Sequence, residues 1–185
     1  MRRYETERLT VRDIELDDAG LIEKYASDYD LAKTTLNIPH PYPKGSAKEF
    51  VTASLQAQEE GKLLILAVTV KPENEFIGLI NLNINKVFNR AELGYWIAKP
   101  FWGKGFGTEA AKEIVRVGFE ELKLNRIYAQ AFTTNPGSYR IMEKVGLKHE
   151  GILKEHVKRN GDYFDIKVYG MTKSEYNLLK NQARF

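Results

Sequence analysis

Gly103, Gly105 and Gly107 stand at every second position between an expected strand and an expected helix. Glycine allows a tight turn, and the first N–H groups of a helix have no acceptor within the helix itself. A strand that leads through such a loop into a helix therefore presents several backbone N–H groups in one direction. These groups and the positive end of the helix dipole suit a phosphate or a pyrophosphate.

Three other interpretations of this glycine loop have to be weighed. Gly105, Gly107 and Ala110 fit the pattern G-x-G-x-x-A, but that dinucleotide fingerprint opens a parallel β-α-β array with an acidic residue near the end of the next strand. Here the next strand, expected over 126–132, leads into two threonines. The phosphate-binding spacing G-x-x-x-x-G-K-[ST] occurs nowhere in the chain. A purely structural glycine turn stays open.

The elements on either side position the loop. A strand begins at Glu92 and continues until Pro100 ends it. Its alternating large residues are Leu93, Tyr95 and Ile97. After the loop we expect a helix that Thr108 caps through its hydroxyl, and Glu109 in the first turn suits the positive end of the dipole.

A second stretch with chemical potential covers residues 135–147, which read NPGSYRIMEKVGL. Asn135 is a natural N-cap with Pro136 at the first helical position, and Gly146 is placed to end the helix. A well-capped short helix would by itself explain the asparagine.

Composition narrows the class of protein. The 185 residues suit one domain with its own core, and 43% hydrophobic and 29% charged residues are typical of a soluble globular protein. The net charge of +3 and the lack of a basic run argue against nucleic acid as a direct partner. Without cysteine there is no disulfide, thiolate nucleophile or Cys-based metal site. No apolar run is long enough for a membrane span or signal peptide, so we expect a cytoplasmic protein with no membrane partner.

The rest of the chain alternates helices and strands without an internal repeat or linker, which predicts a single domain over 1–185. We expect strands over 8–14, 63–70, 76–85, 149–157 and 163–172, and helices from 17, over 48–58 and over 173–181. Short turns between consecutive strands imply antiparallel pairing, and Asn160-Gly161 is a strong hairpin signal. A stiff, proline-rich connector with His40 and Tyr42 covers 37–46.

Trp102–Ala110 (WGKGFGTEA) resembles the pyrophosphate loop of the GNAT superfamily of acetyl-CoA-dependent N-acetyltransferases. Trp102 stands where Gln or Arg is usual, as it does in the RimJ/RimL-type branch of ribosomal-protein N-terminal acetyltransferases. Residues 135–147 resemble the second GNAT signature, N-x-x-S-x-x-(I/L)-x-x-K-x-G-(F/L). The opening Thr6-Glu7-Arg8-Leu9 is also similar to that branch.

The resemblance implies an α/β (α+β) GNAT acyl-CoA N-acyltransferase fold: a mixed, mostly antiparallel sheet of about seven strands flanked by helices, splayed between the fourth and fifth strands. It implies acetyl-CoA as cosubstrate and no metal. The pantetheine arm would pair in the splay with backbone near Trp96 and Ile97. The implied cofactor-binding residues are Trp96, Ile97, Trp102, Gly103, Lys104, Gly105, Phe106, Gly107, Thr108, Asn135 and Ser138.

The reaction needs a base for the amine and an acid for the departing thiolate. Glu92 is the candidate base, directly or through a water, and burial among apolar neighbours would raise its pKa. The alternative is an exposed carboxylate that balances Arg90. Many GNAT enzymes use as acid a tyrosine whose place is taken here by Met142. The branch implies Ser138 instead, with Tyr139 as the next candidate.

We therefore expect an N-acetyltransferase that moves an acetyl group from acetyl-CoA to a primary amine in a ternary complex. By resemblance, the acceptor is the N-terminus of a ribosomal or other protein. Two alternatives stay open, namely acetylation of a small amine (a polyamine or aminoglycoside) and a non-catalytic CoA-binding module. An acidic cleft would favour polycations. The oligomeric state is open, a homodimer included.

Overall fold

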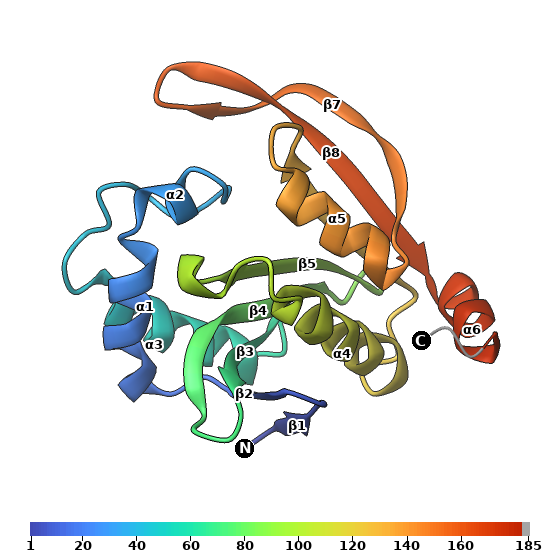
Figure 1. Ribbon diagram of the computed structural model, residues 1–185. Coiled ribbons are helices and arrows are strands. Elements are labelled where there is room, and N and C mark those ends of the chain that lie inside the picture. The colour runs from blue at the N-terminus through green and yellow to red at the C-terminus, as the bar shows by residue number, and fades with distance from the viewer. Residues whose placement is uncertain (183–185) are drawn as a thin grey trace.

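The computed structural model describes residues 1–182, so the last three residues of the expected domain lie outside it. One sheet of eight strands runs in the order β1-β2-β3-β4-β5-β6-β8-β7 (Figure 1). The strands are β1 (Arg3–Glu5), β2 (Leu9–Asp13), β3 (Leu63–Val70), β4 (Glu75–Asn85), β5 (Arg90–Ile97), β6 (Arg126–Phe132), β7 (Lys148–Arg159) and β8 (Asp162–Thr172). The strand missed by the sequence is β1, whose three residues are too few to show alternation.

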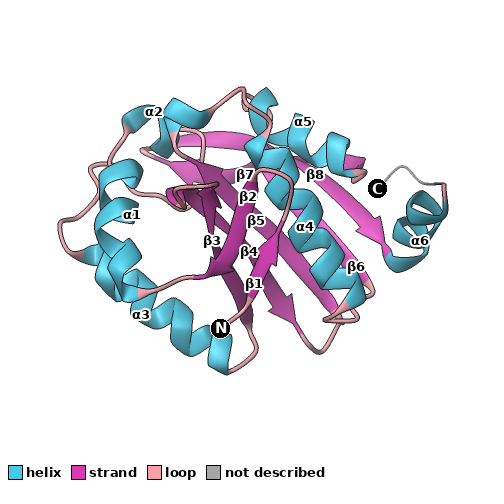
Figure 2. Ribbon diagram, turned by 60° about the horizontal axis from the view of Figure 1, so that its bottom comes forward, coloured by secondary structure: helices cyan, strands magenta, loops and turns pink. Residues whose placement is uncertain are grey.

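Helices cover both faces of this sheet (Figure 2). They are α1 (Ala19–Ala26), α2 (Tyr29–Ala32), α3 (Ser46–Glu59), α4 (Phe106–Glu120), α5 (Pro136–Val145) and α6 (Lys173–Asn181). One apolar cluster packs α1 and α3 on the sheet, and a larger one packs α4 and α5 on it. Because strand side chains alternate, β5 contributes Trp96 to the first cluster and Leu93 and Ile97 to the second.

The sheet opens where the resemblance predicted. β5 pairs with β4 along its whole length, from Arg90 to Ile97. Its parallel pairing with β6 ends at Leu93 opposite Ala129, whereas β6 continues along β8 as far as Phe132. The edge of β5 that follows Leu93 therefore faces a gap between the two strands. The predicted splay is confirmed between β5 and β6.

The start of α4 corrects one expectation. Thr108 does not cap this helix; the helix begins at Phe106, and Gly105 is the N-cap with φ of 82°. That left-handed conformation is open to glycine at little cost, so the chain turns directly from the loop into the helix. At α5 the expected caps are confirmed, because Asn135 Oδ1 accepts from the Ser138 N–H at 3.1 Å and Gly146 ends the helix with φ of 101°.

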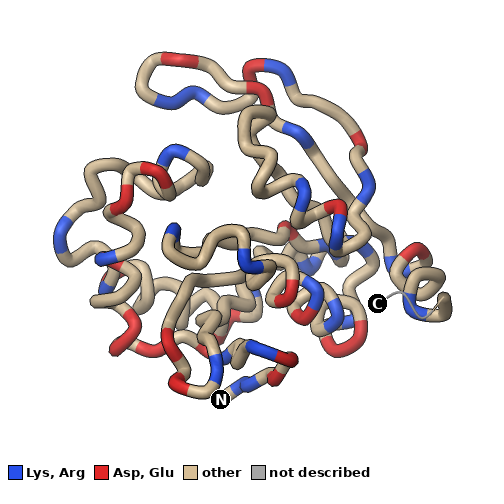
Figure 3. Tube along the Cα trace, viewed as in Figure 1, with Lys and Arg blue, Asp and Glu red and all other residues tan. Residues whose placement is uncertain are grey.

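Basic and acidic residues are interspersed over the whole trace (Figure 3). No helix within residues 1–182 is both long and apolar enough to cross a membrane. In the same part of the chain, no three His, Asp or Glu side chains form a group that could hold a metal ion.

Candidate active site

A cavity of about 1010 Å³ follows the splay and is lined from both faces of the sheet. On one side are α1, α3 and the segment 33–45 that connects α2 to α3. On the other side are the glycine loop and α5. The predicted site residues that line the cavity are Glu92, Trp96, Ile97, Trp102, Gly103, Gly105, Phe106, Gly107, Thr108, Asn135 and Ser138. Lys104 does not line it, and its Nζ lies 5.3 Å from the centre of the Phe101 ring.

The glycine loop has the geometry of an anion site. Gly103 and Gly105 have φ of 75° and 82°, which bulkier residues rarely adopt. Within residues 1–182, no hydrogen bond uses a backbone N–H of residues 103–108 as its donor. At Gly107 a Cβ would come within 2.8 Å of Ile141 Cδ1, so the end of the Ile141 side chain would have to shift to accept a larger residue. These N–H groups at the start of α4 fit the diphosphate of CoA.

Trp102 connects the loop to the end of β5. Its indole Nε1–H donates to the Ile97 carbonyl at 2.5 Å. One acceptor position of that carbonyl, which the resemblance assigned to the pantetheine arm, is thus already used. Trp96 packs edge-on against Phe76, with ring centres 6.0 Å apart. A direct contact of Trp96 and Ile97 with the cofactor stays a prediction.

Glu92 is half-buried on β5, opposite Asn83 of β4 and Tyr128 of β6. Loss of solvent raises the pKa of its carboxyl group, and a hydrogen bond from the Tyr128 hydroxyl at 3.3 Å partly offsets that effect. The described residues contain no ion pair between Glu92 and Arg90; the Arg90 guanidinium lies over the rings of Phe88 and Tyr128 instead. A desolvated carboxylate with a raised pKa suits a general base.

Ser138 lies beside a tyrosine that the sequence analysis did not select. The Tyr95 hydroxyl is 2.8 Å from the Ser138 carbonyl, to which it donates, and 3.1 Å from Ser138 Oγ. Burial raises the pKa of Tyr95 well above its ordinary value, so the phenol stays protonated. The alternation of Leu93, Tyr95 and Ile97 placed this phenol on the α4 face, and that signal could have identified it.

The other acid candidate is placed elsewhere. Tyr139 does not line the cavity; its ring stacks on Tyr169 with centres 6.3 Å apart, and Lys167 Nζ lies 4.0 Å from its centre. Met142 lines the cavity, as expected for the position where a tyrosine is usual. Ser138 is therefore better placed than Tyr139 to meet a bound thioester.

Asn135 has both amide atoms bonded to backbone. Besides capping α5, it donates from Nδ2 to the Thr34 carbonyl at 2.9 Å. Arg159, at the end of β7, holds the same segment through the carbonyls of Thr35 at 2.9 Å and Ile38 at 3.2 Å. The segment 33–45 that contributes much of the lining is thus fixed from two sides. Its Tyr42 lines the cavity, while its His40 does not.

The cavity is mostly apolar and carries few charges. Among the described residues that line it, Glu92 is the only carboxylate, and Arg140 and Lys144 are the basic ones. Asn81 and Asn83 stand on β4 opposite Gly94 and Glu92 respectively, so their amides flank the carboxylate on its own face of the sheet.

Residues 8–148 match the family model of the acetyltransferase (GNAT) domain. The chain belongs to the GNAT family. This GNAT protein is 33% identical over 177 residues to "Uncharacterized N-acetyltransferase p20" of Bacillus licheniformis. The aligned region covers 95% of this chain and 99% of the relative. It is 37% identical over 105 residues to the "Putative ribosomal N-acetyltransferase YdaF" of Bacillus subtilis. These residues make up 56% of this chain and 57% of the relative. A spermidine N-acetyltransferase of Vibrio cholerae, solved with CoA and spermine, superposes with a TM-score of 0.81 at 25% identity and covers 93% of this chain and 99% of the other.

The family fixes the general chemistry of the site. This GNAT protein is an acetyl-CoA-dependent N-acetyltransferase, and its cosubstrate is acetyl-CoA. The N–H groups of the glycine loop are of the right kind for the diphosphate. The edge of β5 after Leu93 is not paired with β6 and suits the amides of the pantetheine arm, although Trp102 already uses one acceptor position of the Ile97 carbonyl.

Proposed function

We propose that this GNAT enzyme acetylates the N-terminal α-amine of a protein or peptide. The observation that carries the proposal is the charge of the cavity, where Glu92 is the only lining carboxylate among the described residues. Polyamines and aminoglycosides carry several ammonium groups, and each group that leaves water needs an opposite charge or strong acceptors. One carboxylate accommodates one amine.

The lining of the acceptor side supports the same choice. Leu36, Ile38, Pro39 and Phe50 offer apolar surface for the side chains of a peptide. Within residues 1–182 the side-chain amides of Asn81 and Asn83 form no hydrogen bond, and they can pair with the peptide groups of an acceptor. The similarity to the ribosomal N-acetyltransferase is in line with such an acceptor, and ribosomal proteins and acetyl-CoA meet in the cytoplasm. The similarity to the spermidine enzyme keeps a small amine as the second candidate.

In the proposed mechanism each group acts at a stated atom. A Glu92 carboxylate oxygen takes a proton from the acceptor ammonium, directly or through a water, and frees the lone pair that attacks the acetyl carbon. As the new C–N bond forms and the C–S bond breaks, the nitrogen, which still carries two protons after the attack, releases one of them to solvent. Ser138 Oγ–H gives its proton to the leaving sulfur and is reprotonated from solvent, while the neutral Tyr95 phenol holds the serine in place.

A panel of acceptors tests this proposal. It should contain peptides with a free N-terminus, the same peptides with a blocked N-terminus and an internal lysine, spermidine, and an aminoglycoside. Thiol release would be followed with a chromogenic reagent, and mass spectrometry would locate the acetyl group. We expect the thiol of CoA to be released only with the peptides that have a free N-terminus. Higher kcat/KM for spermidine would refute the peptide acceptor, and CoA binding without release for any amine would favour a binding module.

A further inference from the structure

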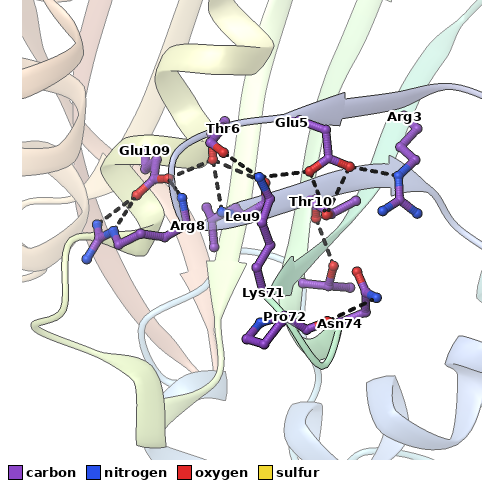
Figure 4. Close-up of polar contacts among 11 residues, drawn as sticks. Arg3, Glu5, Thr6, Arg8, Leu9, Thr10, Lys71, Pro72, Asn74 and Glu109 are labelled. Atoms are coloured by element: carbon purple, nitrogen blue, oxygen red, sulfur yellow. Dashed lines mark hydrogen bonds and ion pairs between the residues drawn. The ribbon is translucent and has the colours of Figure 1, made fainter.

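Glu109, in the first turn of α4, is held by the turn between β1 and β2 (Figure 4). Its Oε1 accepts from Thr6 Oγ1 at 2.6 Å and from the Arg8 backbone N–H at 2.8 Å. Its Oε2 accepts from Arg8 Nε at 2.8 Å and forms an ion pair with Arg8 Nη2 at 2.7 Å. The carboxylate is 16% exposed. Partly buried and bonded on both oxygens, it ties two segments that are 101 residues apart.

The same arginine reaches the glycine loop itself. Arg8 Nη1 donates to the Lys104 carbonyl at 2.9 Å, and its guanidinium lies 4.8 Å from the centre of the Phe106 ring. A Cβ on Gly105 would stand 3.3 Å from Arg8 Nη2. Arg8 thus lies along three consecutive residues of the loop. The planar guanidinium has several N–H groups and can bond the Glu109 carboxylate and the Lys104 carbonyl at the same time, a geometry that a lysine could not supply.

This contact sets the orientation of one peptide group. In a planar trans peptide the C=O and the N–H point in opposite directions. Because the Lys104 carbonyl points to Arg8, the N–H of Gly105 points away from Arg8. Gly105 lines the cavity and Arg8 does not. The direction of this N–H therefore follows from the arginine.

The turn that carries Arg8 is fixed in its own right. Lys71 Nζ donates to the Thr6 carbonyl at 2.6 Å and pairs with Glu5 at 2.9 Å (Figure 4).

Arg8 also compensates the negative charge of Glu109, because an unpaired carboxylate at the start of α4 would repel an anion there. Burial opposes ionisation of Glu109, but the hydrogen bonds from Thr6 and Arg8 outweigh it and lower the pKa of the carboxyl group.

We propose that Arg8 is a positioning residue which, anchored by Glu109, presets the glycine loop to receive the diphosphate of CoA. The inference rests on CoA binding by this loop and is independent of the acceptor. Arg8 acts through the Lys104 peptide and does not itself contact the ligand. The N-terminal motif and the loop motif that resemble the family are thus joined by the contacts of Arg8 with Glu109 and Lys104.

The test measures dissociation constants by titration calorimetry, so no acceptor is needed. The ligands are CoA, 3′-dephospho-CoA, and pantetheine, which lacks the diphosphate. The variants are Arg8→Met, Arg8→Lys and Glu109→Gln. Arg116→Met is the matched control, because Arg116 pairs with Glu113 farther along the same helix, away from the loop. Thermal melting of each variant separates lost binding from lost folding.

We expect Arg8→Met, Arg8→Lys and Glu109→Gln each to weaken CoA and 3′-dephospho-CoA about tenfold, the equivalent of one charge-assisted hydrogen bond. Pantetheine binding and the Arg116→Met control should stay unchanged. Equal loss for pantetheine would show a general structural effect and overturn the proposal.

Three further outcomes would also overturn it. An effect confined to CoA would mean that Arg8 binds the 3′-phosphate directly. Full rescue by lysine would mean that charge alone matters. If Glu109→Gln left CoA affinity unchanged or improved it, Arg8 would be a direct ligand of the diphosphate. If the unaltered chain bound no CoA, the proposed function would fail together with this inference.

Discussion

Asn135 offers a prediction in which one side chain has two separable tasks. Its Oδ1 caps α5 and its Nδ2 holds the Thr34 carbonyl. Serine at this position keeps a capping oxygen but is too short to reach Thr34, whereas alanine removes both contacts. The pair Asn135→Ser and Asn135→Ala therefore separates the cap from the attachment of the segment 33–45.

The expected magnitudes follow from these contacts. Loss of an N-cap costs about 1 kcal/mol, and loss of one neutral hydrogen bond costs about 1 kcal/mol. Asn135→Ser should then lower the free energy of unfolding by about 1 kcal/mol, and Asn135→Ala by about 2 kcal/mol. For a chain of this size, each kcal/mol corresponds to about 2–4 °C in Tm. Calorimetric melting can resolve the two steps.

The kinetic consequence is more specific than the loss of stability. The segment 33–45 contributes to the acceptor side of the cavity, so its release by Asn135→Ser should raise KM for the acceptor and leave KM for acetyl-CoA nearly unchanged. Arg159→Met is the matched variant, because the Arg159 guanidinium donates to two carbonyls of the same segment and is not part of the cap of α5. It should reproduce the change in KM. The reasoning is refuted if Asn135→Ser raises KM for acetyl-CoA alone, which would make Asn135 a direct cofactor ligand.

Three other predictions concern the chemical groups. Glu92→Gln should remove the acidic limb of the kcat/KM–pH profile and lower kcat by about 100-fold or more. Burial raises the pKa of Glu92 in the folded state. At a pH above that raised pKa, the ionised Glu92 therefore lowers the stability of the fold, whereas at a pH below 4.5, its pKa in the unfolded chain, the group is protonated in both states and has no effect. The glutamine variant should therefore melt higher than the parent at neutral pH but not at acidic pH, and an unaltered profile would remove Glu92 as the base. Ser138→Ala should lower kcat more than KM for acetyl-CoA, and Tyr95→Phe should do so to a smaller degree; kcat unchanged by Ser138→Ala would assign the proton to water. Gly105→Asp should raise KM for acetyl-CoA by about tenfold or more, because it adds a negative charge close to the anion site and places a carboxylate beside Arg8 Nη2, where it would compete for the contact that holds the loop; an unchanged KM would contradict the loop assignment.

Local patterns in the sequence predicted most of the elements. Alternation and turn residues located the main strands, and the caps Asn135 and Gly146 located α5. The expected helix over 173–181 is α6 (Lys173–Asn181). Failures came where the backbone competed with a side chain. Thr108 is a good capping residue by type, but Gly105 in a left-handed conformation already starts α4 at Phe106, so Thr108 is the third residue of the helix.

Contacts between distant segments were beyond the reach of such patterns. Nothing in the spacing of residues shows that Arg8 lies on the glycine loop or that Asn135 holds Thr34. Both are polar contacts across more than half of the chain, and they depend on where the packed helices bring the loops. The sequence could identify each partner as a polar residue in a motif, but it could not pair them.

The alternation of side chains along β5 would explain why the proposed chemistry needs the splay. Glu92 and Tyr95 are separated by an odd number of positions, so their side chains leave opposite faces of the strand. In a continuous sheet the acceptor side and the cofactor side would be isolated from each other by the neighbouring strand. Pairing with β6 stops at Leu93, between the two residues, and the cavity passes through this opening. In the proposed mechanism, a base on one face would then act on the amine and a hydroxyl donor on the other face would act on the leaving sulfur of the same transfer, which neither face of a closed sheet would allow.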